Sequence, residues 1–184
     1  MPDVQEATAK EIVRLSELYI DGTLRLSLGA DARAMQLSGI LGTVSTALVV
    51  AGIGAFLGNA LVDRNRFALT ASLIAPAICF MIGLAYSLSA AAPRGFYIGG
   101  NYFSLWSSDE DLFGPLSNAL IEQARVYEEQ INENNEDLER RATKIRLALR
   151  FIWLAPITAL IAGAIVYAGF GHIAQLADWV KSLH

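Results

Sequence analysis

Three long apolar stretches constrain this chain of 184 residues more than any other feature. They cover residues 37–62, 67–92 and 151–174, and none of them contains Asp, Glu, Lys or Arg. Because a helix rises about 1.5 Å per residue, each stretch is long enough to cross a hydrocarbon layer of roughly 30 Å. The sequence therefore predicts an all-α integral membrane protein with three transmembrane helices, a hairpin followed by a third span.

Composition agrees with this fold class. Hydrophobic residues make up 54% of the chain and the mean hydropathy is +0.40, which is high for a soluble domain. The first apolar stretch follows an arm with several acidic residues rather than a basic leader, so we expect it to be a retained span and not a cleaved signal peptide. The single cysteine, Cys79, excludes an intrachain disulfide and is expected to pack as a small side chain.

The positive charges predict an orientation. With the N-terminus inside, 11 Lys and Arg residues lie on the cytoplasmic side and 3 on the other side. An excess of basic residues marks the cytoplasmic face of membrane proteins. We therefore expect a multi-pass protein of the bacterial inner (plasma) membrane with a cytoplasmic N-terminus and a periplasmic C-terminus.

Five segments follow from these spans. They are a cytoplasmic amphipathic arm (1–36), a transmembrane hairpin (37–92), a cytoplasmic segment (93–149), a third transmembrane helix (150–172) and an outer-surface interfacial tail (173–184). The hairpin turn is expected at residues 62–66. The apolar stripe of the arm is predicted at Ile12, Leu15, Tyr19, Leu24 and Leu28.

Two features of these segments predict helix contacts. Gly54 and Gly58 form a small-xxx-small pair in the first span, which fits either packing against the second span or a contact between subunits. In the central segment, a 4-3-4-3-4 spacing predicts a heptad seam on a long helix that runs into the third span. Its members are Leu120, Ala124, Tyr127, Ile131, Asn134 and Leu138. If Asn134 is buried there, leucine in its place should strengthen the seam and loosen its register.

The start of the central segment differs from the rest. Residues 94–106 are aromatic and interrupted by glycine, so we expect a short extended aromatic piece around a turn. An acidic helix start is expected at residues 108–111, and Gly114-Pro115 is typical of the start of the longer helix.

No arrangement typical of catalysis is visible. His172 and His184 lie near the C-terminus without a partner base or nucleophile, and there is no phosphate-binding loop. The spans hold hydroxyl residues but no ionisable residue at mid-membrane, which disfavours an ion-coupled carrier and leaves a homo-oligomeric pore open. We expect a non-enzymatic protein with no catalytic residues, no metal site and no cofactor.

A ligand site is the remaining chemical hypothesis. Basic and aromatic side chains in and beside the central segment could hold an anionic ligand with a stacking base. The candidates are Arg94, Tyr97, Tyr102, Trp106, Arg140, Arg141 and Lys144. Two other interpretations compete: the basic residues flank the third span as the orientation rule requires, and the aromatic residues pack on the N-terminal arm.

The layout resembles the membrane effectors of bacterial Pycsar-type antiphage systems. The resemblance rests on the spans and on short motifs, which are Gly29 to Ala34 before the first span, Tyr102-Phe103 before residues 109–112, and Tyr127, Gln130, Ile131, Asn134, Lys144 and Arg146 on the helix entering the third span. It implies an inner-membrane effector whose cytoplasmic part senses a cyclic pyrimidine nucleotide and which then damages the membrane by assembling.

Three functional classes therefore stay open. The first is a nucleotide-gated, membrane-disrupting antiphage effector, and the second is an accessory or scaffolding subunit of a larger membrane complex. The third is a membrane enzyme or carrier. The expected partners are the lipid bilayer, further copies of the chain and a cyclic nucleotide, with no nucleic-acid polymer.

Overall fold

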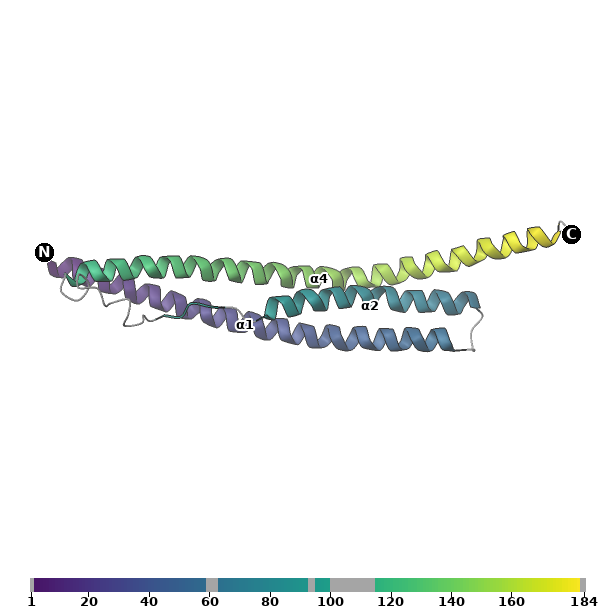
Figure 1. Ribbon diagram of the computed structural model, residues 1–184, viewed down its shortest axis with the longest axis horizontal. Helices are drawn as coiled ribbons and strands as arrows, with labels where there is room; N and C mark the ends of the chain where they lie inside the picture. The colour runs from purple at the N-terminus through teal and green to yellow at the C-terminus, as the bar shows by residue number, and fades with distance from the viewer. Residues whose placement is uncertain (1, 59–62, 93–94, 100–114, 183–184) are drawn as a thin grey trace. The chain divides into compact units, whose positions relative to one another are not determined.

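The computed structural model describes residues 2–58, 63–92, 95–99 and 115–182, and the side chains within 5–58, 63–92, 95–99 and 115–169. Its helices are α1 (Pro2–Leu57), α2 (Asp63–Ala91) and α4 (Leu116–Ser182) (Figure 1). In the described part of the chain, each of these helices contains a stretch that is long and apolar enough to cross a membrane. For the described residues, the prediction of an all-α fold with three helices that are long and apolar enough to span a membrane is therefore confirmed.

The helix ends differ from the predicted ones in three places. α1 ends at Leu57, and residues 63–66 of the predicted hairpin turn are helical because α2 begins at Asp63. The Gly58 amide donates to the Gly54 carbonyl at 2.9 Å and closes the last turn of α1, while an acidic residue suits the start of α2. At the C-terminal end, α4 continues through Gly169 to Ser182, where we expected a separate tail from residue 173.

The segment before α4 is only partly described. Residues 95–99 are non-helical, and the other residues of the predicted aromatic piece, 94 and 100–106, lie outside the described residues, as does the predicted acidic helix start. α4 begins directly after Pro115, as the Gly114-Pro115 pair predicts, and the Asn118 amide donates to the Pro115 carbonyl at 2.9 Å.

Contacts divide the chain into two units. We call residues 1–32 and 92–142 the polar unit, and residues 33–91 and 143–184 the apolar unit. The sequence predicted changes of segment after residues 36, 92 and 149. The N-terminal arm and the central segment thus belong to one unit, and α1 and α4 each contribute residues to both units.

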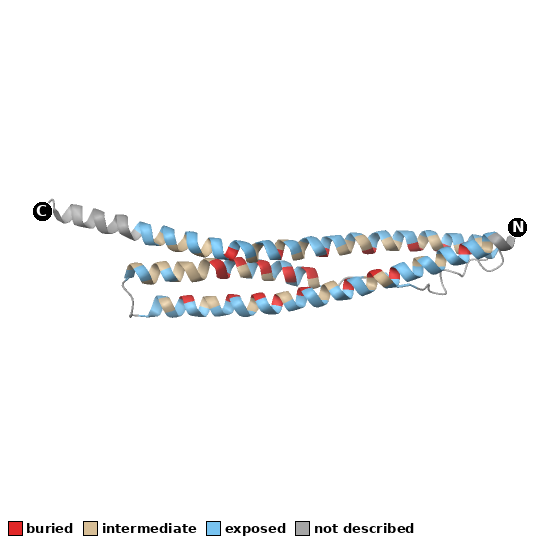
Figure 2. Ribbon diagram, turned by 180° about the vertical axis from the view of Figure 1, so that it is seen from behind, coloured by how far each residue is buried: buried red, intermediate tan, exposed pale blue. Residues whose placement is uncertain are grey.

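In the polar unit, α1 and α4 bury an unusual set of side chains. On α1 the buried residues are Ala9, Ile20, Thr23 and Ser27, and on α4 they are Ala119, Gln123, Tyr127, Asn134 and Arg141. Figure 2 shows such buried positions recurring along the helices as separate patches. Of the predicted seam, Tyr127 and Asn134 are buried and the other four residues are half-buried.

The predicted stripe on the N-terminal arm lies mostly outside this buried face, although the Tyr19 hydroxyl accepts a hydrogen bond from Asn135 Nδ2 on α4 at 3.4 Å. Ile12, Leu15 and Tyr19 are 47%, 53% and 51% exposed, whereas Ile20 is fully buried. Ala9, Thr23 and Ser27, which have small or hydroxyl side chains, are buried with Ile20, whereas the more apolar face beside them stays exposed.

The apolar unit is held by close helix approaches at three glycines. A methyl group at Gly52 would meet Ile74 at 2.7 Å, one at Gly83 would meet the Ala148 carbonyl at 3.3 Å, and one at Gly163 would strike the Ser72 hydroxyl. Gly54 has open space around it, so the predicted Gly54–Gly58 pair does not pack against α2 or α4. Small residues at contact points are typical of helix packing in lipid.

Candidate functional site

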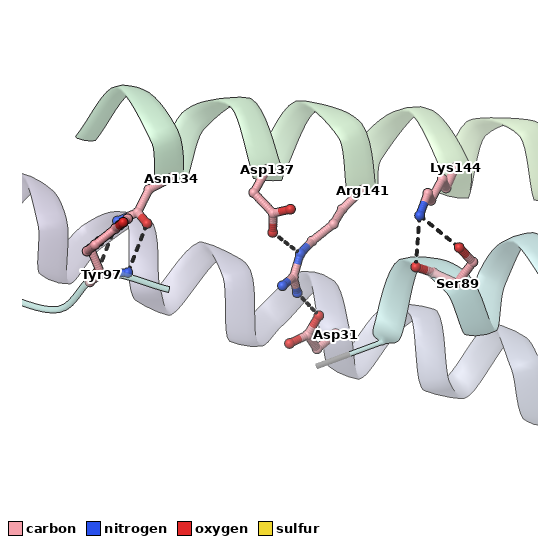
Figure 3. Close-up of polar contacts among 7 residues, drawn as sticks. All are labelled: Asp31, Ser89, Tyr97, Asn134, Asp137, Arg141 and Lys144. Atoms are coloured by element: carbon pink, nitrogen blue, oxygen red, sulfur yellow. Dashed lines mark hydrogen bonds and ion pairs between the residues drawn. The ribbon is translucent and has the colours of Figure 1, made fainter. Parts of the chain in front are cut away.

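The predicted ligand residues lie in or beside the polar unit. Arg94, Tyr102 and Trp106 lie outside the described residues. Figure 3 shows three of the others, Tyr97, Arg141 and Lys144, each with its partners. They do not converge on one cavity.

Arg141 is the centre of a buried ionic cluster. Its guanidinium contacts Asp137 Oδ2 at 2.6 Å, one turn away on α4, and Asp31 Oδ1 on α1 (Figure 3). The Arg141 side chain is 5% exposed, and those of Asp137 and Asp31 are 14% and 36% exposed. Burial alone would lower the pKa of Arg141, but the hydrogen bonds to Asp137 and Asp31 outweigh it and raise the pKa. The Arg141 guanidinium therefore links α1 to α4.

Asn134 forms a two-way bond with the backbone of Tyr97. Its Oδ1 accepts the Tyr97 amide at 3.1 Å, and its Nδ2 donates to the Tyr97 carbonyl at 3.0 Å (Figure 3). Asn134 is 2% exposed. The amide side chain thus pairs with an extended segment as a neighbouring strand would, and this fixes residues 95–99 against α4.

A cavity of about 490 Å³ lies beside this pair. Tyr97, Asn134 and Arg140 line it, together with three carboxylates, Glu133, Glu136 and Asp137. Arg140 is bound to Glu136 at 3.0 Å. The hydrogen bond to Glu133, together with its negative charge, raises the pKa of Tyr97 above its ordinary value. The lining is acidic, which favours a cation over a phosphate.

Lys144 belongs to the apolar unit and serves a different contact. Its ammonium donates to the Ser89 hydroxyl at 2.7 Å and to the Ser89 carbonyl at 3.1 Å at the last turn of α2 (Figure 3). A lysine bound to the last carbonyls of a helix also favours the helix dipole. Sequence reasoning assigned this lysine to a ligand and missed its structural partner.

Other partners were also missed. Tyr127, 1% exposed, donates its hydroxyl to Glu17 Oε1 at 3.0 Å. The i,i+4 spacing of Asp137 and Arg141 was a readable signal for their pair. Nothing in the sequence paired Glu17 or Asp31 with residues 110 positions away.

Within ranges 5–58, 63–92, 95–99 and 115–169, no three His, Cys, Asp or Glu side chains gather as metal ligands. The Cys79 sulfur lies 3.5 Å from the Thr158 hydroxyl, between α2 and α4.

Comparison with known proteins finds no family model that matches the chain, and no curated protein or solved structure that matches it.

Proposed function

We propose that this chain is a non-enzymatic, multi-pass protein of the bacterial inner membrane that works as a homo-oligomer. The observation that carries the proposal is an exposed apolar stripe on α1 within the polar unit. Ile12, Leu15, Tyr19 and Leu26 follow each other at spacings of three, four and seven residues and are 47%, 53%, 51% and 66% exposed.

This stripe has heptad spacing and lies on a different face of α1 from its buried residues Ala9, Ile20, Thr23 and Ser27. Four of the residues between the stripe members are charged, which argues against burial in lipid; they are Arg14, Glu17, Asp21 and Arg25. Ile12 to Leu26 spans about 21 Å of helix. Apolar residues at a and d positions over two heptads are typical of helices that associate.

A second copy of the chain is the occupant that fits this stripe. All copies of a membrane protein insert with one orientation, so their α1 helices run parallel, and equivalent positions of the stripe can meet. Gly22 lies within the stripe with open space around it, which gives room for the partner helix. The flanking positions carry no run of like charges that would oppose a parallel pair.

The charges support the orientation in this proposal. The polar unit combines the N-terminal arm with the central segment, as it must if both lie on one side of the membrane. These two regions and their borders hold 11 of the 14 basic residues, which the positive-inside rule assigns to the cytoplasm.

The nucleotide-gated effector is a narrower form of this proposal. Assembly through α1 would serve such an effector, but its phosphate site has to lie away from the cavity at Tyr97, because Glu133, Glu136 and Asp137 line that cavity. Arg141 is likewise held by two carboxylates. An accessory subunit of a larger complex would use the same stripe for a different protein.

The experiment is the mass of the full-length protein in lipid nanodiscs, with the double variant L15Q/Y19Q against the control L28Q. Leu28 is 60% exposed; it belongs to the stripe predicted from the sequence but falls outside the three- and four-residue spacing of Ile12, Leu15, Tyr19 and Leu26. We expect a defined oligomer for the wild type and the control, and monomers for the double variant. A monomeric wild type contradicts the proposal, and an oligomer that survives L15Q/Y19Q removes the stripe as its basis.

The same sample separates the narrower forms. A panel of cyclic nucleotides that changes the mass would support the gated effector. A ligand-independent assembly that contains other proteins when purified from its native membrane would support the accessory role.

A further inference from the structure

The charged residues of the apolar unit gather at its two borders, and the two borders differ. Its described part holds seven charged side chains. Arg33, Lys144, Arg146 and Arg150 are at one border, and Asp63, Arg64 and Arg66 are at the other. The first four share a border because the Ser87 hydroxyl donates to the Ala34 carbonyl and Lys144 binds Ser89.

At the border with Asp63, the cations are satisfied within the chain. Arg66 contacts the Asp63 carboxylate at 2.8 Å. The Arg64 guanidinium lies 3.5 Å from the centre of the Tyr167 ring and donates to the Tyr167 carbonyl at 2.9 Å. Asp63 offsets one of the two arginines, so this border has a net charge of about one positive unit.

At the opposite border, three arginines are exposed. Arg33 and Arg150 have no ion-pair partner among the described residues. Arg146 donates to the Thr143 hydroxyl at 3.2 Å. This end of the apolar unit carries no carboxylate in its described residues, so it has a net charge of about four positive units.

An aromatic residue marks the depth of this border. Trp153 is 78% exposed and follows Arg146 by seven residues and Arg150 by three, so it lies near both on the surface of α4. Exposed tryptophan in a membrane helix prefers the level of the lipid headgroups. The guanidinium groups of Arg146 and Arg150 can therefore reach the phosphates by extending along the helix toward water.

We propose that Arg33, Arg146 and Arg150 bind the headgroup phosphates of anionic phospholipids at this border of the apolar unit. Guanidinium groups present a planar set of donors that matches phosphate oxygens. A basic side chain near an anionic membrane surface strengthens binding roughly fivefold.

The test is native mass spectrometry of the full-length protein with equal amounts of phosphatidylglycerol and phosphatidylcholine of the same chain length. We expect the wild type to retain phosphatidylglycerol at least about fivefold better than phosphatidylcholine. The triple variant R33Q/R146Q/R150Q should bring this ratio to within about twofold of one. A triple variant with the wild-type ratio overturns the proposal.

Two further variants make the result specific. R64Q/R66Q removes two cations from the opposite border and should keep the wild-type ratio, since these cations already have partners. The charge-preserving triple variant R33K/R146K/R150K should keep most of the preference and shows that a loss in the glutamine variant reflects charge rather than misfolding. An equal loss in R64Q/R66Q would show that only net charge matters and would overturn the assignment to this border.

Discussion

The polar and apolar units solve the same packing problem with different side chains. Both bury faces of long helices against each other, yet the polar unit buries Arg141, Asn134 and Gln123 while the apolar unit uses glycine, alanine and serine at its contacts. The difference shows which interactions can hold helices together in water and which can do so in lipid. In water, leucine and isoleucine can drive association, whereas in lipid they gain little by leaving the acyl chains.

The polar unit nevertheless leaves much of its hydrophobic driving force unused. Its buried polar groups fix one register of α1 on α4, because each has a specific partner. Its apolar stripe of Ile12, Leu15, Tyr19 and Leu26 stays exposed. A helix pair of this kind has a defined geometry but retains a hydrophobic surface for another molecule.

The largest expected loss of stability tests whether the ionic cluster of Arg141, Asp31 and Asp137 stabilises the polar unit. R141M leaves Asp31 and Asp137 facing each other without their cation, so we expect the free energy of unfolding to fall by about 3 kcal/mol. This value lies at the low end for buried pairs because the Asp31 side chain is 36% exposed. Thermal unfolding of the full-length protein in mild detergent, followed by circular dichroism, measures it.

The neighbouring arginine provides the control. Arg140 pairs with Glu136 on the surface, where both side chains are more than 60% exposed, so R140M should change stability by less than about 1 kcal/mol. The triple variant D31N/D137N/R141M, which removes all three charges, should recover part of the loss. Equal effects of R141M and R140M would show that the cluster does not hold α1 to α4.

The next effect probes the apolar unit in the same way. At Gly163, a larger side chain would strike Ser72 on α2, so G163L should cost about 2 to 3 kcal/mol by forcing the helices apart. At Gly54, the same change meets open space, so G54L should leave unfolding unchanged. Unfolding in a titration of denaturing detergent compares them, and a G54L loss as large as that of G163L would contradict the observed packing. The G54L mass in nanodiscs also tests whether this face joins subunits.

How far the sequence predicted these features depends on the kind of signal. The three spans were predictable because long runs without charge are a strong one-dimensional pattern, and the start of α4 was predictable from Gly114-Pro115. The face that α1 buries was not. The rule that apolar residues point inward selects Ile12 and Leu15, whereas α1 buries Ala9, Thr23 and Ser27.

The candidate site was less predictable for a related reason. Composition showed basic residues near Arg140 but not which of them have acidic partners, since Asp31 and Arg141 lie 110 residues apart. Likewise, Asn134 was predictable as part of a seam, but its bond to the backbone of Tyr97 requires a loop whose path no periodicity encodes.

A smaller effect concerns this hydrogen-bonded pair. The heptad interpretation expects N134L to strengthen the seam, but the structure reverses the sign, because leucine removes both bonds to Tyr97. We expect a loss of about 1 to 2 kcal/mol, since the Tyr97 backbone can turn to water. The exposed neighbour variant N132L should be near neutral. A more stable N134L protein in thermal unfolding would restore the heptad interpretation.

The smallest effect compares this pair with a hydrogen bond of the apolar unit. Fully buried Ser87 donates to the Ala34 carbonyl on α1 at 2.7 Å, so S87A removes one interhelical bond. We expect a loss of only about 0.6 kcal/mol, since such bonds in membrane proteins contribute little on average. The Ala34 carbonyl also keeps the hydroxyl of Ser38 at 2.8 Å as a partner. S72A is the matched control, because the Ser72 hydroxyl bonds only the Ala68 carbonyl of its own helix at 2.9 Å. In a titration of denaturing detergent, S87A could lower the free energy of unfolding by more than N134L does. That result would show that specific polar contacts, and not close approach at glycines, hold the apolar unit. The contrast between the two units would then fail.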